Sequence, residues 1–171
     1  SLRDGGIRWL IDVVKFAVGT GFRVSEICNL RWSDVDLTHG FVSAKNNEFG
    51  RTKSGNDRTI PFGSDVRVLL EGRHALRSRE ADDFVFIGIG GSRLDPVYVS
   101  KLFKMYIRLA MLPAEIHFHS LRHTYGSWLA MAGISIFKIK ELMGHADIST
   151  TQTYAHLEPD NLRSAVESVF G

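Results

Sequence analysis

Hydrophobic residues recur every three or four positions along most of the chain, which is the spacing of one face of an α-helix. The first such stretch carries Leu10, Val14 and Ala17 on one side, and the glycines of Gly19-Thr20-Gly21 end it. A short helix is expected after Ser25. The longer predicted helices cover residues 6–18, 64–77, 96–110, 119–132, 135–143, 149–155 and 160–169.

Between residues 41 and 61 the pattern changes to short segments separated by turn-forming residues. We predict three antiparallel strands there, at 41–45, 48–53 and 57–61. Outside this sheet, 33–36 is predicted to be a turn and 84–87 a short strand. The predicted fold class is therefore mainly α with a small antiparallel β-sheet (α+β), in one domain that spans 1–171.

The composition is that of an ordinary globular domain. A chain of 171 residues with 44% apolar and 23% charged residues can bury a sizeable core. Its apolar runs are too short to cross a bilayer and it shows no secretory signal, so we expect neither a membrane partner nor secretion. Its one cysteine, Cys28, excludes an internal disulfide and suits a buried thiol in a reducing compartment. The net charge of +2 permits a nucleic-acid partner without requiring one.

The segment HFHSLRHTYG carries the first candidate chemistry. His119 and Arg122 are three residues apart on a predicted helix and share a face, where a guanidinium could bind a phosphate and an imidazole could exchange a proton. Taken alone, this spacing favours a surface histidine and a salt-bridged arginine. His117 and His123 invite a metal site, but Ser120 stands where a zinc protease needs Glu and no cysteine pair is present. We therefore expect no metal.

Four further polar residues allow both a structural and a chemical interpretation. Arg23 stands at a helix start, where backbone N–H groups favour an anion, but it also suits a solvated cap. Lys53 lies on the predicted hairpin and would ordinarily be an exposed turn lysine. His145 follows Gly144 at a helix end, which is also a normal C-cap sequence. Tyr154 lies in a polar run, and the other three tyrosines are interpreted as core residues: Tyr98, Tyr106 and Tyr125.

Together these segments resemble the catalytic domain of the tyrosine recombinases, the phage integrase family, over roughly residues 7–158. The first two shared motifs are T-G-x-R-x-S-E, beginning at Thr20, and T-K-x-G-x-x-R-x-[IV]-P, beginning at Thr52. The others are H-x-x-R and G-H-x-x-x-x-T-T-x-x-Y. The resemblance implies the catalytic-domain fold of that family, with Glu26 orienting Arg23 or a histidine. It implies six catalytic residues: Arg23, Lys53, His119, Arg122, His145 and Tyr154.

The same resemblance implies a reaction. Tyr154 attacks a DNA phosphate and forms a covalent 3′-phosphotyrosine, and Lys53 protonates the leaving 5′ oxygen. A 5′ hydroxyl of a second strand reverses the step, so site-specific recombination needs no metal, no ATP and no other cofactor. Candidate DNA contacts, each of which also suits an ordinary solvated charge, are Lys45, Arg51, Arg58, Lys101, Lys104 and Arg108.

The resemblance also predicts the partners. Full-length members carry an N-terminal DNA-binding domain that this chain lacks, so we expect an isolated domain that is monomeric when free and binds double-stranded DNA weakly. The full-length protein is expected to form a homotetramer on DNA, in the cytoplasm and at the nucleoid of a bacterial or phage-infected cell. The helix at 160–169 either packs on its own domain or docks on a neighbouring protomer. A type IB topoisomerase and a non-enzymatic DNA-binding module are the alternative functions.

Overall fold

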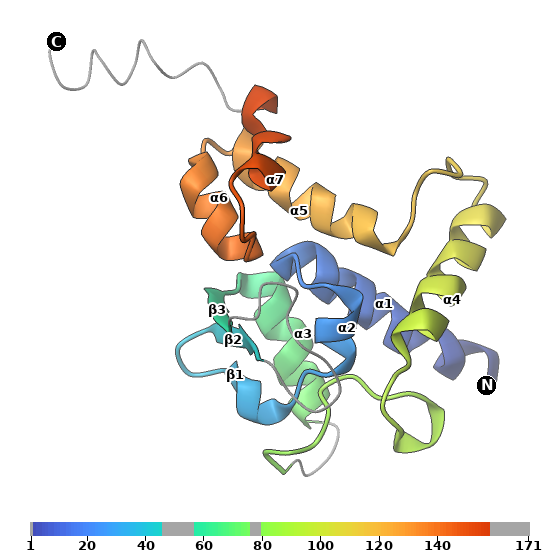
Figure 1. The fold of residues 1–171 in the computed structure, drawn as a ribbon. Helices are drawn as coiled ribbons and strands as arrows, with labels where there is room; N and C mark the ends of the chain where they lie inside the picture. The colour runs from blue at the N-terminus through green and yellow to red at the C-terminus, as the bar shows by residue number, and fades with distance from the viewer. Residues whose placement is uncertain (1, 46–56, 76–79, 158–171) are drawn as a thin grey trace, which may run out of the picture.

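A computed structural model describes residues 2–45, 57–75 and 80–157 (Figure 1). The mainly helical fold with a small antiparallel sheet is confirmed. Within the described parts of the chain, no helix is long and apolar enough to cross a membrane. The helices are α1 (Leu2–Thr20), α2 (Val24–Cys28), α3 (Ser64–Ala75), α4 (Pro96–Leu109), α5 (Phe118–Met131), α6 (Ile136–Met143) and α7 (Ser149–Gln152).

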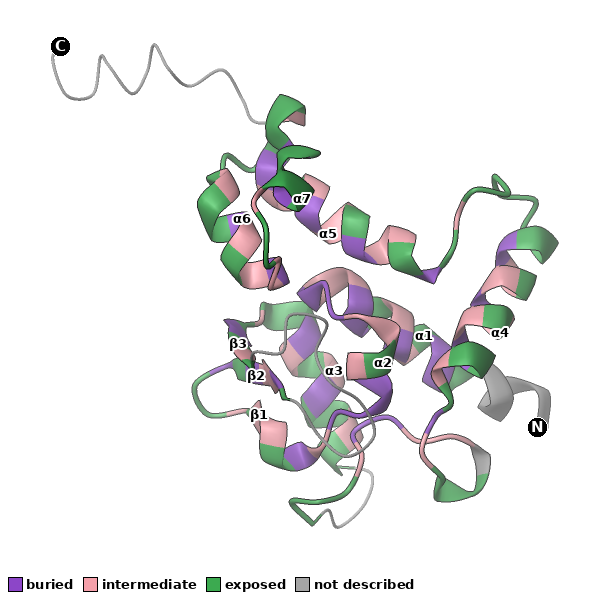
Figure 2. Cartoon of the chain, viewed as in Figure 1, coloured by how far each residue is buried: buried purple, intermediate pink, exposed green. Residues whose placement is uncertain are grey.

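Helix α1 lies at the centre and packs against both α3 and α5 (Figure 1). Its buried side belongs to the main hydrophobic core, where Phe16 meets Phe22 and Phe86 edge to face at ring-centroid distances of 5.6 and 5.1 Å. A smaller cluster joins α5, α6 and the segment after α7, and its buried members include Met143 and Tyr154. Figure 2 shows these buried stripes on the inward faces of the helices. Helix α5 contributes to both clusters, with Phe118 in the main core and Ala130 in the smaller cluster. The fold therefore has two packed parts, and α5 joins them.

The sheet contains three antiparallel strands in the order β1 (Val35–Asp36), β2 (Phe41–Ala44) and β3 (Arg58–Pro61). The predicted strands at 41–45 and 57–61 are confirmed, and the one predicted at 48–53 lies outside the described residues. The prediction of a turn at 33–36 is wrong for its second half, because β1 pairs there with β2. Gly40, with φ +77°, closes the tight turn that lets the two strands pair. Strand β1 has only two residues, too few to show an alternating pattern in the sequence.

The predicted helices are found with small changes at their ends. Asp95 caps α4 by accepting a hydrogen bond of 2.7 Å from the Tyr98 N–H. The helix predicted at 149–155 is split into α7 and a 3₁₀ turn at Ala155–Leu157, and the one predicted at 160–169 lies outside the described residues. The strand predicted at 84–87 is wrong, because this segment makes only isolated bridges. Tyr98 was predicted to be a core residue but is 56% exposed.

Candidate active site

Arg23 is fixed by the sharp turn between α1 and α2. Its backbone N–H donates to Glu26 Oε2 at 2.7 Å, and its Nη1 donates to Glu26 Oε1 at 2.8 Å. Gly21 before it has φ +65°, and a Cβ there would lie 2.4 Å from the Tyr125 ring, so only glycine fits the turn. The first turn of α2 thus holds Arg23 by its own Glu26 rather than by a serine cap.

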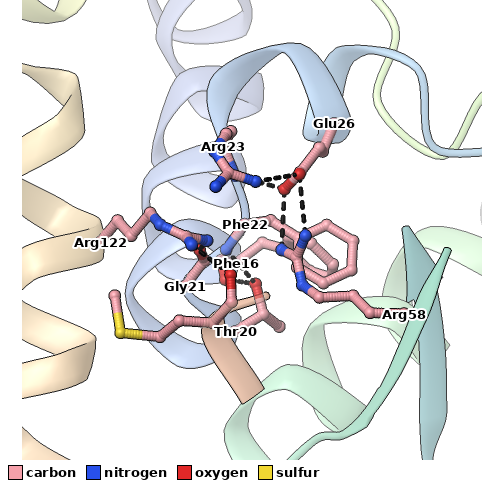
Figure 3. A network of polar contacts seen from close by, with 9 residues as sticks. Phe16, Thr20, Gly21, Phe22, Arg23, Glu26, Arg58 and Arg122 are labelled. Carbon is pink, nitrogen blue, oxygen red and sulfur yellow. Dashed lines mark hydrogen bonds and ion pairs between the residues drawn. The ribbon is translucent and has the colours of Figure 1, made fainter. Parts of the chain in front are cut away.

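Arg122 reaches from α5 across to this turn and is 2% exposed (Figure 3). Its Nη1 donates to the Gly21 carbonyl at 2.5 Å, and its Nη2 donates to the Met143 carbonyl at the end of α6. Burial, together with the charges of Arg23 and Arg58, lowers the pKa of Arg122. A guanidinium nevertheless stays charged at neutral pH, and these two bonds use only two of its five N–H donors. Arg122 therefore joins both parts of the fold and keeps donors for an anion.

Arg58 on β3 points inward, not toward the surface where a DNA contact was predicted. Its side chain is 9% exposed and donates to both carboxylate oxygens of Glu26 at 2.8 Å. Its guanidinium carbon lies 4.7 Å from the centroid of the Phe22 ring. Figure 3 shows Glu26 between Arg23 and Arg58. Burial alone raises the pKa of Glu26, but Arg58 and Arg23 outweigh it and lower that pKa to about 2. Glu26 is therefore ionised and holds two arginines at once.

A pocket of about 460 Å³ opens between α2, α4 and α5. Arg23, His119 and Arg122 line it together, along with Lys104 and His117. Burial and the charges of His123, Arg122 and Arg23 lower the pKa of His119 to about 4. The pocket therefore combines permanent positive charge with an imidazole that is neutral at physiological pH, which is an environment for a phosphate.

His145 and Tyr154 lie close to Arg122, although they do not line this pocket. Gly144, with φ +62°, ends α6 in the predicted left-handed C-cap. His145 Nδ1 lies 2.9 Å from Thr151 Oγ1, and burial together with Arg122 lowers the pKa of His145 to about 4. Tyr154 is 3% exposed, and burial raises its pKa, which the Arg122 charge opposes. Tyr154 is thus buried, where its polar sequence neighbours indicated a half-exposed position.

His123, which the sequence predicts to be structural or to face a phosphate, lies beside Tyr154 instead. Its Nδ1 lies 2.9 Å from Tyr154 Oη, and its ring meets the His119 ring edge to face at 4.9 Å. The signal in the sequence is the four-residue spacing of His119 and His123, which places both rings on one face of α5. No group of three or more His, Cys, Asp or Glu that could hold a metal occurs among residues 2–45, 57–75 and 80–157.

Comparison with known proteins identifies the family. A family model described as "Phage integrase family" matches residues 7–161. The chain belongs to the phage integrase family. The tyrosine recombinase XerC of Oceanobacillus iheyensis is 34% identical over 160 residues, which cover 90% of this chain and 50% of XerC. The tyrosine recombinase XerA of Pyrococcus furiosus is 36% identical over 160 residues, covering 91% of this chain and 52% of XerA. The chain therefore spans about half the length of these curated relatives.

Solved structures of integrase-family proteins share the fold. A crystal structure of XerA recombinase superimposes with a TM-score of 0.72 and 27% identity, covering 95% of this chain and 57% of that one. The Tn1549 transposon integrase in complex with a circular-intermediate DNA superimposes with a TM-score of 0.76 and 25% identity. The match covers 92% of this chain and 57% of the integrase chain. The recombinase fold expected from the sequence is therefore confirmed.

The remaining candidate residues, Lys53 and the proposed DNA contacts, differ in how they are placed. Lys53 and Arg51 lie outside the described residues, so their roles stay predictions. Lys45 forms an ion pair with Asp34 at 2.8 Å while its side chain remains 46% exposed. Lys104 donates to the carbonyls of Ala114 and Ile116 at the pocket, and Lys101 and Arg108 are exposed on α4.

Proposed function

We propose that this chain is the catalytic domain of a site-specific DNA recombinase that cuts and rejoins strands through a covalent 3′-phosphotyrosine. The observation that carries the proposal is that a pocket lined by two arginines and a buried tyrosine hydroxyl both lie against helix α5. Arg23, His119 and Arg122 line that pocket, and Tyr154 bonds to α5 at the residue after Arg122. Family membership and the DNA-bound Tn1549 integrase support the same conclusion.

In this proposal the scissile phosphate binds where Arg23 and Arg122 can both donate to its non-bridging oxygens. Negative charge builds on these oxygens as the tyrosine attacks, and fixed guanidinium donors stabilise it without rearranging. Arg122 is suited to this because two backbone carbonyls already hold it in place. The arginines thus supply the charge stabilisation that other nucleases obtain from metal ions.

The remaining catalytic residues complete the cycle. When the Thr151 hydroxyl donates to Nδ1 of His145, the proton of the neutral ring is on Nε2, which can donate to the same phosphate. Tyr154 Oη forms the bond to phosphorus, the bond from phosphorus to the 5′ oxygen breaks, and Lys53 gives that oxygen a proton. His119, neutral at pH 7, adds a hydrogen bond at the pocket wall. Attack by a 5′ hydroxyl then reseals the strand.

The larger assembly is also part of the proposal. We infer that double-stranded DNA is the partner and that the full-length protein acts as a homotetramer on it, with an N-terminal DNA-binding domain and a cytoplasmic, nucleoid-associated location. The segment at 160–169 then either covers its own domain or docks on a neighbouring protomer. We expect the free domain to stay monomeric and to bind DNA weakly.

The test uses a pool of nicked duplexes whose bases around the nick are randomised. Cleavage next to a nick releases a short strand, so the reaction cannot reverse and a covalent protein–DNA adduct accumulates. We expect the wild-type chain to form an adduct that survives denaturation, and recovery of the trapped DNA to yield the preferred site. Tyr154→Phe is expected to form none while still binding DNA.

Tyr98→Phe is the matched control, because Tyr98 is 56% exposed, stacks on Trp9 and does not line the pocket. It should form the adduct as the wild type does. An adduct in Tyr154→Phe would show that another residue is the nucleophile, and no adduct from any protein would refute the catalytic proposal for this chain. Relaxation of supercoiled plasmid without strand exchange would favour a topoisomerase instead.

A further inference from the structure

We propose that His123, rather than His119, is the residue that holds the Tyr154 hydroxyl and accepts its proton when the tyrosine attacks DNA. This inference rests on the proposed strand-transfer function. It starts from one contact, the 2.9 Å separation of His123 Nδ1 and Tyr154 Oη, because a nucleophile and its base must lie within hydrogen-bond reach. Among the described residues, no other side chain makes a hydrogen bond to Tyr154 Oη.

The direction of this hydrogen bond follows from the surroundings. Burial, with the charges of Arg122 and His117, lowers the pKa of His123 below its ordinary 6.5, so the ring is neutral at pH 7. Burial raises the pKa of Tyr154 above 10.0, so the phenol keeps its proton. The phenol must then donate, and Nδ1 must accept, which places the imidazole proton on Nε2. The resting pair is a protonated nucleophile beside an unprotonated base.

The packing holds both rings in this position. A Cβ added to Gly126 would lie 2.7 Å from Tyr154 Cζ, so the phenol ring lies directly on the α5 backbone one turn after His123. On its other side His123 meets His119 edge to face. Helical spacing of 119, 123 and 126 puts all three on one face of α5. The nucleophile, the proton acceptor and a third orienting group therefore form one chain.

The proton balance is closed within the site. As Tyr154 Oη bonds to phosphorus and the 5′ oxygen departs, the phenol proton moves to His123 Nδ1 and gives an imidazolium. When a 5′ hydroxyl attacks the phosphotyrosine, it gives its own proton to the group that protonated the departing 5′ oxygen, and the proton on His123 returns to Tyr154 Oη. The titratable and charged groups near His123 are His117 at the N-cap of α5, His119 and Arg122 on α5, and His145 after α6. Burial and the permanent positive charge of Arg122 keep His123 neutral between turnovers and ready to accept again.

The test compares His123→Gln with His119→Gln, using the duplex recovered from the random pool. Glutamine can still accept a hydrogen bond from Tyr154 but cannot take its proton. We expect His123→Gln to slow adduct formation about 10²- to 10⁴-fold. Its rate should rise about tenfold per pH unit from pH 7 to 9 as hydroxide replaces the missing base, while the wild-type rate stays flat there. His119→Gln should keep the flat profile.

Three outcomes would overturn the inference. The first is a wild-type rate in His123→Gln. The second is a rate in His123→Gln faster than that of the wild type, which would make the contact a restraint on the tyrosine. The third is a rate that rises with pH in His119→Gln and not in His123→Gln. A second measurement needs no DNA. The ¹⁵N chemical shifts of the His123 ring should indicate the Nε2–H tautomer, and Tyr154→Phe should change the Nδ1 shift. An unchanged shift would equally contradict the inference, whereas a wild-type protein that forms no adduct would refute only the proposed function.

Discussion

Replacing Glu26 by glutamine is expected to destabilise the fold strongly, because this buried carboxylate forms ion pairs with two guanidinium groups, those of Arg23 and Arg58. The pKa of Glu26 falls from 4.5 to about 2 in the folded protein. Each pKa unit corresponds to about 1.4 kcal/mol, so the ionised carboxylate contributes about 3 kcal/mol at pH 7. The side chains of Glu26 and Arg58 are only 6% and 9% exposed, so solvent does little to weaken the attraction between their charges. Breaking such a buried pair costs about 3–5 kcal/mol.

The assay is urea unfolding and thermal melting of wild type and Glu26→Gln across pH. A loss of about 3 kcal/mol corresponds to a Tm lower by roughly 6–12 °C in a domain of this size. The folded pKa is depressed, so the contribution is complete above pH 4.5 and disappears as pH falls toward 2. The stability difference between the two proteins should therefore narrow over that interval.

Glu71→Gln is the matched control for the same chemical change. Glu71 is 53% exposed and 3.7 Å from Arg67, and exposed pairs of this kind contribute about 0–1 kcal/mol. A Glu26→Gln protein no less stable than Glu71→Gln at pH 7, or a stability difference that does not depend on pH, would refute the account of the buried network.

Two further predictions concern α5 and the thiol. Gly126→Ala should destabilise the protein by about 1–3 kcal/mol and displace Tyr154, since its Cβ would meet that ring at 2.7 Å; urea unfolding and adduct yield would measure this. Gly72→Ala is its control on α3, where nothing lies within 4 Å, and should stabilise by up to about 1 kcal/mol. Burial raises the pKa of Cys28 to about 12, so a chromogenic disulfide reagent should label it only after denaturation.

The elements that local spacing defines were predictable, and those that depend on distant partners were not. The α4 stripe of Val99, Phe103 and Ile107 repeats at helical spacing, and the C-cap at Gly144 has a local signature. Strand β1 was missed because two residues carry no period, and its pairing depends on β2. The sequence motifs predicted Arg23 and Arg122, which the structure brings to one pocket.

The inward position of Arg58 and the burial of Tyr154 could not be predicted from the sequence. Arg58 turns inward because Glu26, 32 residues earlier, takes both of its terminal nitrogens. Tyr154 is buried because Gly126 leaves room for its ring and His123 satisfies its hydroxyl. Neither cause lies in the local sequence, which for both residues is polar. Lys53 lies outside the described residues, so its assignment as the acid remains a prediction.

The way Arg122 is held makes its position depend on two distant segments of the chain. Its guanidinium donates to one carbonyl before α2 and to another at the end of α6, two segments that are far apart in the sequence. If either of these segments unfolds, Arg122 loses one of the two carbonyls that hold it. The positively charged groups that cleavage requires are then no longer assembled. Under the proposed function, a damaged or half-made copy is therefore inert toward DNA and leaves no broken strand that it cannot reseal.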